Sequence, residues 1–327
     1  MCILGSDSPL GSISAEKGDC HTATVAILMC TYNGELFLAE QLASFHRQIH
    51  CNWTVYASDD GSQDETLALL HASNAQWGQD RLQIVEGPRR GFVANFLSLT
   101  CRADIKADFY AWADQDDVWK EDKLQRALAW LKTIPGHIPA LYCGRTELID
   151  ESGVSFGYSP KFRLAPHFSN ALVQNIGGGN TMVFNQAARE LLQEAGYSLI
   201  VPSHDWWAYQ LISGAGGVVH YDPIPTVLYR QHDENLVGTN SSWFSRIKRL
   251  RMAFQGRFYV WNTQNIHALE TMRHRLSQEN QVKLARFKGA REQRLFPRIV
   301  GFLRAGIYRQ TLFGNLGLIL AILLKKI

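Results

Sequence analysis

The sequence predicts an α/β fold with a mainly parallel central sheet flanked by helices. Two observations lead to this prediction. Between residues 24 and 132, short apolar runs typical of buried strands alternate with segments whose apolar residues recur at helical spacing. The pace of this alternation is typical of βαβ units, whose strands lie parallel. With 327 residues, 46% of them hydrophobic, the chain is long enough for one large domain with an appendage, or for two domains.

The predicted elements follow one another from residue 24. A strand and turn come first, then a helix, a second strand with its turn and helix, a third strand, a helix, a fourth strand and a helix. A strand predicted to be antiparallel opens the second half. In chain order these segments are residues 24–34, 35–48, 53–73, 82–87, 95–103, 108–117, 121–132 and 141–150.

Charge divides the chain into an acidic body and a basic end. Residues 241–327 hold 17 Lys and Arg against 3 Glu, and residues 1–240 hold 16 against 27. A Gly, Asn and Ser cluster at this boundary suits a linker. We therefore expect a flexible tail over 1–23, a domain over 24–240 and a basic helical extension over 241–327. The basic part indicates an anionic partner.

The N-terminus and the cysteines bear on the cellular compartment. The first 20 residues lack the basic start and the long apolar run of a signal peptide. Six cysteines are scattered without metal-binding spacing, and some lie in apolar runs, as reduced core thiols do. A reducing cytoplasm is therefore expected.

Three polar turns, at residues 30–34, 58–61 and 114–117, follow predicted strands on the edge where α/β sheets bind ligands. Asp114, Asp116 and Asp117 lie within four residues and would raise one another's pKa unless a cation intervenes. An Asp-x-Asp pair offers oxygen ligands for Mg²⁺ or Mn²⁺ together with phosphate oxygens. The alternative is a solvated turn. Asp60 either belongs to a helix-capping turn or accepts hydrogen bonds from a nucleotide.

Four motifs carry a resemblance to a known family. "TYNG", "DDGSQD", "DQDD" and "HDWW", in that order, resemble an inverting GT-A glycosyltransferase of family 2. "GFVANFL", "WADQDDVW" and "YRQH" are similar to bacterial rhamnosyltransferases. The resemblance covers about residues 24–238 and implies the GT-A fold. It also implies that Tyr32 and Asp60 contact the base of a nucleotide-sugar donor, that Asp114 contacts the ribose or the metal, and that Asp116 ligates the metal.

The second half supplies the remaining candidates. Asp205 matches the catalytic base of the family, because inversion needs a carboxylate to deprotonate the acceptor hydroxyl. The alternative is a first-turn acid favoured by the helix dipole. His232 is a candidate metal ligand by resemblance, and otherwise structural. Trp206 and Trp207 either stack on acceptor sugars or belong to the core, and Gly178 allows close approach by the acceptor.

The C-terminal end combines apolar and basic residues. Leu312 to Leu324 is an almost unbroken apolar run of 13 residues, short of the ~20 that a spanning helix needs. Arg291, Arg294 and Arg298 are predicted to share a helical face, and two lysines close the run. This pattern suits an anionic membrane interface, and a helical bundle packed on the body is the alternative. Nucleic acid is a poorer partner, because the cations are interleaved with apolar residues.

The expected function is therefore a metal-dependent inverting glycosyltransferase, peripheral on the cytoplasmic face of a bacterial inner membrane. By resemblance, it transfers L-rhamnose from dTDP-L-rhamnose, or a sugar from a UDP donor, to a lipid-linked oligosaccharide in surface polysaccharide (O-antigen) synthesis. One alternative is a sugar-phosphate nucleotidyltransferase, which would need a basic Gly-rich loop that "CTYNGEL" lacks. The other is a non-catalytic glycan-binding or assembly protein, against which Asp116 and Asp205 argue.

Overall fold

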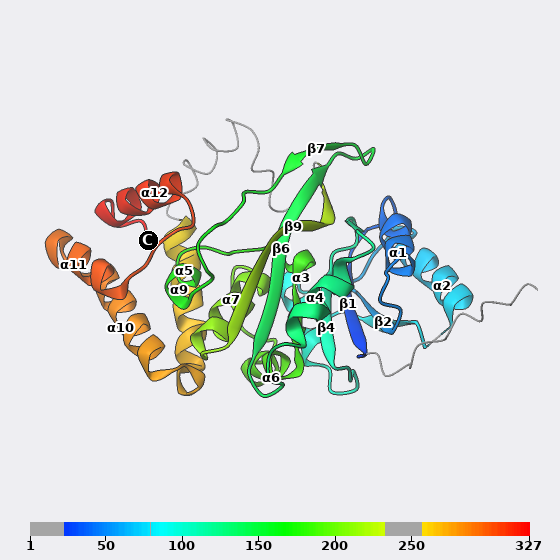
Figure 1. Ribbon diagram of the computed structural model, residues 1–327, viewed down its shortest axis with the longest axis horizontal. Coiled ribbons are helices and arrows are strands. Elements are labelled where there is room, and N and C mark those ends of the chain that lie inside the picture. Colours follow the sequence, from blue (N-terminus) through cyan, green and yellow to red (C-terminus); the bar gives the residue numbers. More distant parts are fainter. Residues whose placement is uncertain (1–22, 79, 233–256) are drawn as a thin grey trace, which may run out of the picture.

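The computed structural model describes residues 23–78, 80–232 and 257–327. Its centre is a nine-stranded sheet with helices packed against it (Figure 1). The predicted α/β architecture is confirmed. Almost all of the predicted tail (1–23) and the whole predicted linker region lie outside the described residues, so the proposed domain boundaries stay predictions.

The first half of the chain forms the parallel part of the sheet, in the order β3-β2-β1-β4. Its elements are β1 (Val25–Thr31), α1 (Leu38–His46), β2 (Trp53–Asp59), α2 (Thr66–Trp77), β3 (Leu82–Glu86), α3 (Phe92–Cys101) and β4 (Phe109–Ala113). All seven correspond to elements predicted from the alternation of apolar patterns. The carboxyl ends of these four strands therefore lie along one edge.

The second half makes the sheet mixed. β8 (Val183–Asn185) pairs antiparallel with both β4 and β6 (Ala140–Ile149). β9 (Val218–Arg230) runs parallel to β6, and β5 (Val118–Trp119) and β7 (Ser155–Tyr158) are antiparallel to their neighbours. Parallel pairing thus joins the first four strands to one another and β6 to β9, whereas β5, β7 and β8 pair antiparallel with their neighbours.

The remaining helices follow the sheet strands or extend beyond them. They are α4 (Lys123–Leu131), α5 (Phe168–Ala171), η1 (Gly179–Thr181), α6 (Gln186–Ala195), α7 (His204–Gly214), α9 (Arg257–Thr271), η2 (Arg273–Arg275), α10 (Gln278–Glu292), α11 (Leu295–Ala305) and α12 (Leu312–Leu323). Ten of the eleven residues of α7 are buried, so it is a core helix buried on nearly every side.

Both faces of the sheet are covered. Along β1, Ala26, Leu28 and Cys30 belong to one hydrophobic cluster, and the alternate residues Val25, Ile27 and Met29 belong to another. A strand covered on both faces is apolar throughout, which explains why β1 is an unbroken apolar run. The first cluster continues into α9–α12, so the C-terminal helices share a core with the sheet.

The C-terminal helices lie at the opposite end of the molecule from α1 and α2 (Figure 1). The prediction that Arg291, Arg294 and Arg298 share a helical face is wrong, because α10 ends before α11 begins. Arg291 and Arg298 are buried and donate hydrogen bonds to the carbonyls of Ile327 and Ile322 at the chain end. Among the described helices, none is long and apolar enough to span a bilayer.

Candidate functional site

The turn after β4 brings carboxylates together with the first turn of α7. Burial, followed by the charges of Asp116 and Asp205, raises the pKa of Asp114 to about 8. Burial and the charges of Asp114 and Asp60 likewise raise the pKa of the Cys30 thiol. Electrostatic coupling of this kind requires short separations. Asp116 and Asp205 therefore lie near enough to Asp114 to act on it electrostatically, and Asp60 and Asp114 both act on Cys30. We call Asp60, Asp114, Asp116 and Asp205 the carboxylate cluster.

The two predicted metal ligands are in direct contact. His232, just beyond β9, lies with its Nε2 2.8 Å from Oδ2 of Asp116. Both side chains are only slightly exposed, and the His232 ring packs on Phe37 at 5.3 Å. Asp116 and His232 are 116 positions apart in the chain, so their contact forms only when the strands between them are paired in the folded sheet.

This donor set fits a divalent cation held partly by a ligand. In the described part of the chain no group of three or more His, Cys, Asp or Glu side chains is arranged to hold a metal ion. Mg²⁺ and Mn²⁺ are commonly bound by one or two protein groups together with phosphate oxygens. Asp116 and His232 supply two such groups, and a cation would offset the mutual repulsion in the carboxylate cluster.

Asp117 has a different role from its neighbours, because its side chain is fully buried. One oxygen accepts a hydrogen bond of 2.6 Å from Asn180 Nδ2, and the other accepts one of 3.3 Å from the backbone N–H of Arg230. Burial, followed by the charges of Asp116 and Asp114, raises its pKa well above the usual range. Asp117 thereby joins the turn after β4 to η1 and to the end of β9.

Arg230 is a buried residue that holds the turn after β4 in place. The sequence analysis did not predict this role. Its guanidinium donates to the backbone carbonyls of Asp116, at 3.0 Å, and of Glu151, at 2.8 Å. It also pairs with Glu40 of α1 and lies over the Phe37 ring. An arginine at the end of a strand gives no sign in the sequence of partners up to 190 positions away.

Tyr32 is the exposed member of the site, and its backbone is fixed by Gln115. Gln115 Oε1 accepts from the Tyr32 N–H at 2.8 Å, and its Nε2 donates to the Tyr32 carbonyl at 3.0 Å. A Cβ on Gly34 would lie 2.4 Å from Gln115 Oε1, so this close approach requires glycine. Tyr32 as a residue is 57% exposed, so Gln115 holds its backbone while the residue remains accessible to solvent. Gln115 was not predicted as a site residue.

Asp59 and Asp60 have different structural roles, because each accepts hydrogen bonds from a different loop. Asp59 accepts from the backbone N–H groups of Gly61 and Ser62 at 3.1 and 2.8 Å, which stabilises the turn. Asp60 accepts from the N–H groups of Arg89 and Gly91 at 2.6 and 2.8 Å. Asp60 therefore holds the loop between β3 and α3 against the turn after β2, and its predicted contact with the donor remains a prediction.

Asp205 is held by two backbone donors at the start of α7. Its Oδ1 accepts from the Trp206 N–H at 2.6 Å, and its Oδ2 accepts from the Gly179 N–H at 3.2 Å. The preceding His204 is buried and stacks on Phe96 at a centroid distance of 4.0 Å. A Cβ on Gly179 would lie 2.3 Å from His204 Nε2, so η1 rests directly on the imidazole ring.

Of the predicted acceptor residues, Trp206 and Trp207 lie in the core and Gly178 lies on the surface. Trp207 is fully buried, and Trp206 is nearly so, with its Nε1 donating to the Ala171 carbonyl at 2.7 Å. Their positions support the core alternative over stacking on a sugar. Gly178 is exposed and directly precedes Gly179, the residue that binds Asp205.

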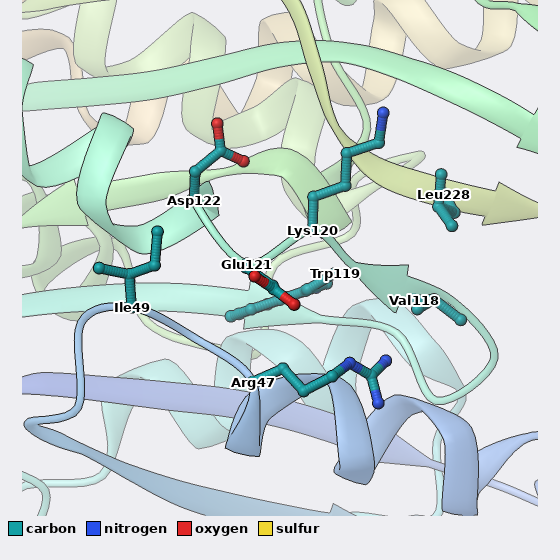
Figure 2. A pocket seen from close by; sticks show the side chains of 8 residues that line it. All are labelled: Arg47, Ile49, Val118, Trp119, Lys120, Glu121, Asp122 and Leu228. Atoms are coloured by element: carbon teal, nitrogen blue, oxygen red, sulfur yellow. The ribbon is translucent and has the colours of Figure 1, made fainter.

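A hollow of about 460 Å³ lies beside edge strand β5 (Figure 2). None of the predicted site residues lines it. Its lining residues are Arg47, Ile49, Val118, Trp119, Lys120, Glu121, Asp122 and Leu228. The Lys120 amino group pairs with Glu147 at 2.7 Å.

Comparison with known proteins identifies the family. Residues 26–192 match the family described as "Glycosyl transferase family 2", a segment that includes Tyr32, Asp60, Asp114, Asp116 and Gly178. The match covers more than half of the chain. The chain therefore belongs to glycosyl transferase family 2, which sets aside the nucleotidyltransferase alternative.

Two relatives and one solved structure show what this chain is similar to within and beyond the family. The chain is 28% identical over 236 residues to the dTDP-rhamnosyl transferase RfbG of Shigella flexneri, covering 68% of this chain and 78% of that protein. It is 23% identical over 155 residues to the Escherichia coli UDP-Glc:alpha-D-GlcNAc-diphosphoundecaprenol beta-1,3-glucosyltransferase WfgD, covering 47% and 57%. The crystal structure of GalNAc-T7 with UDP, GalNAc and Mn²⁺ aligns at a TM-score of 0.53 and 12% identity, covering 89% of this chain and 56% of that one. This likeness confirms the GT-A fold.

Proposed function

We propose that this family 2 glycosyltransferase is a metal-dependent inverting enzyme in which Asp205 is the catalytic base. The observation that carries the proposal is the position of Asp205, which shares the carboxylate cluster with Asp114 and Asp116 and is oriented by two backbone N–H groups. A base for inversion must lie beside the donor site and point at the acceptor hydroxyl. The Gly179 N–H and the Trp206 N–H fix the orientation of the Asp205 carboxylate.

The carboxylate cluster is the proposed donor site. Asp116 and His232 would hold Mn²⁺ or Mg²⁺, which when bound would neutralise charge on the diphosphate of the donor. Tyr32 and Asp60 would contact the base, and Asp114 the ribose or the metal. Support comes from the contact between Asp116 and His232 and from the exposure of Tyr32. The structurally similar GalNAc-T7 was crystallised with UDP and Mn²⁺.

The donor is proposed to be dTDP-L-rhamnose, with a UDP-sugar as the second candidate. The similarity to a dTDP-rhamnosyl transferase, which extends over 68% of this chain, supports the first. The acceptor is proposed to be a lipid-linked oligosaccharide in bacterial surface polysaccharide (O-antigen) synthesis. Relatives of this chain include an enzyme named for a diphosphoundecaprenol acceptor. The acceptor sugar would approach over Gly178, next to Asp205.

A lipid-linked acceptor implies work at a membrane. We therefore propose that the protein is peripheral on the cytoplasmic face of the bacterial inner membrane, with an anionic leaflet as partner. The excess of Lys and Arg over Glu in residues 241–327 supports this location.

The experiment that tests the proposed base uses Asp205→Asn. We expect this variant to bind dTDP-L-rhamnose in the presence of Mn²⁺ as the wild type does, because the amide keeps the size of the side chain. Release of dTDP should fall by at least ~10²-fold, the usual effect of losing a positioned base. Thermal shifts with a panel of dTDP-, UDP- and GDP-sugars measure binding, and a coupled assay for nucleoside diphosphate measures turnover.

A matched control separates catalysis from helix stabilisation. Glu279 is the first-turn acid of α10, so Glu279→Gln removes the same favourable interaction with a helix dipole. It should leave turnover unchanged. Near wild-type turnover in Asp205→Asn would assign the base to another residue, and loss of donor affinity would place Asp205 in the donor site instead.

A further inference from the structure

The outer face of α12 is an apolar surface without a covering element among the described residues. Its side chains are 38–82% exposed and recur at the spacing of one helical face. We define the outer α12 face as Leu312, Phe313, Leu316, Ile319, Leu320, Leu323 and Leu324. Soluble proteins rarely expose so many adjacent apolar side chains unless the surface binds something.

The opposite face holds α12 in place. Leu318 and Ile322 are buried in the main hydrophobic cluster, and the Arg298 guanidinium donates to the Ile322 carbonyl at 3.0 Å. Thr311 caps the helix start by accepting from the Gly314 N–H. The helix is therefore fixed on the body with its outer face directed away from the core.

Charge identifies the partner of this face. Residues 293–327 contain six Lys and Arg and neither Asp nor Glu. Lys325, which directly follows the outer α12 face in the chain, and Arg304 of neighbouring α11 are exposed. α11 leaves Phe296 and Leu303 exposed as well. An apolar face with a basic rim complements an anionic lipid surface. A second copy of this chain would bring like charges together instead.

We propose that the outer α12 face lies in the interface of an anionic membrane. At 12 residues, α12 is about 18 Å long, so it lies along the surface and does not cross it. The inference rests on the proposed function for its purpose, since a lipid-linked acceptor resides in the same membrane. Binding to lipid is nevertheless a property of the face itself and is measured without turnover.

The structure refines which residues make this contact. Arg291 and Arg298 were expected to face the lipid, but their guanidinium groups are buried against backbone carbonyls. Apolar insertion by α12 therefore contributes most of the affinity, and the exposed cations select anionic lipid. Added salt should reduce the preference for anionic vesicles more than it reduces binding as a whole.

The test is flotation of the full chain with vesicles of phosphatidylcholine, alone or mixed with phosphatidylglycerol. The wild type should float with the mixed vesicles. The triple variant Leu316→Glu, Ile319→Glu, Leu323→Glu should bind them at least about a hundredfold more weakly, because three apolar contacts are lost. Its thermal midpoint should stay near that of the wild type, since these side chains are exposed.

The control is a second triple variant with the same added charge, Ile224→Glu, Val260→Glu, Val282→Glu. Its side chains are 44–53% exposed, as are the three changed on α12, but they lie on β9, α9 and α10. It should float like the wild type. The inference is overturned if the α12 variant floats equally well, if both triple variants lose binding alike, or if the wild type does not float.

Two further measurements distinguish membrane binding from self-association and test the proposed donor independently. Light scattering measures mass without lipid, and a wild-type dimer that the α12 substitutions convert to a monomer would make the face a self-association surface, which overturns the inference. Binding of dTDP-L-rhamnose is measured in parallel. A protein that floats but does not bind this donor contradicts the proposed donor and leaves the membrane inference standing.

Discussion

Buried guanidinium groups organise this molecule at the scale of single residues. A buried charge is costly unless its hydrogen-bond donors are satisfied, and a planar arginine can satisfy several backbone carbonyls at once. Arg230 does so for Asp116, Asp150 and Glu151. It thus joins the turn that carries a proposed metal ligand to the turn between β6 and β7.

Replacement of Arg230 should therefore affect the metal site as well as stability. Arg230→Lys keeps the charge but cannot reach the same set of acceptors, so we expect the free energy of unfolding to fall by at least about 2 kcal/mol. Because the Asp116 turn loses its clamp, Mn²⁺-dependent binding of dTDP should weaken about tenfold or more. Urea denaturation and calorimetry with Mn²⁺ or EDTA measure the two effects.

Arg189 provides the control, because it is an equally buried arginine away from the carboxylate cluster. Its guanidinium donates to Thr100, Ile105 and Tyr110 and lies over the Tyr110 ring at 4.4 Å. Arg189→Lys should lower stability to a similar extent and leave Mn²⁺-dependent dTDP binding unchanged. An equal loss of dTDP binding in both variants would reduce the role of Arg230 to general stability.

At the scale of elements, the site depends on the contact between η1 and the first turn of α7. His204 stacks on Phe96 and lies edge-on to Trp112 at 4.7 Å, and neither ring nitrogen has a hydrogen-bond partner among the described residues. The ring therefore provides an apolar surface on which Gly179 packs. Its position fixes that of the Gly179 N–H, which donates a hydrogen bond to the proposed base.

Burial of His204 predicts a pH dependence of stability. Burial lowers its pKa from 6.5 to about 4, so the unfolded chain binds a proton more readily than the folded protein. The neutral ring's contribution is complete above pH 6.5 and is lost as the pH falls towards about 4. The difference is worth up to about 3 kcal/mol, at about 1.4 kcal/mol per pH unit.

A variant isolates this contribution from those of other titrating groups. His204→Leu cannot titrate and keeps an apolar side chain beneath Gly179. Between about pH 7 and about pH 5, its free energy of unfolding should fall less than that of the wild type. Urea denaturation at both pH values measures the difference. The same pH dependence in the two proteins would mean that His204 is already accessible to solvent when folded.

The sequence predicted the parts of this molecule that depend on local patterns. Strand and helix alternation gave the parallel strands, and carboxylates after strands pointed to Asp114 and Asp116. Residues whose role depends on distant partners were not predictable. The Gln115 clamp on Tyr32 spans 83 positions, and nothing near Arg230 in the chain indicates Glu40.

Uniform burial also concealed the role of two aromatic residues. Trp206 and Trp207 lie on a helix that is buried on nearly every side, so no apolar periodicity distinguished a core position from an exposed one. Their place in the core follows from the packing of α7 between the sheet and α9, which only the folded structure shows.

At the scale of the whole molecule, the carboxylate cluster and the outer α12 face belong to one body. The hydrophobic cluster that contains Leu28 and Trp112 of the sheet extends through Phe287 and Phe302 to Leu318. A surface on α12 is therefore held in a fixed position relative to the carboxylate cluster, the proposed donor site. An enzyme acting on a lipid-linked acceptor needs such a relation, because the acceptor is confined near the membrane plane.

This shared core predicts the result of removing α12. A chain ending at Gln310 keeps the bonds of that glutamine to Leu164 but loses three buried side chains, those of Leu318, Ile322 and Ile327. Each contributes about 1.5–3 kcal/mol, so the truncated protein should unfold at a clearly lower urea concentration. It should still bind dTDP with Mn²⁺ and should not float with anionic vesicles. An unchanged urea midpoint would show that α12 is not packed on the body in solution, and then the face that meets the membrane would not be set by the fold.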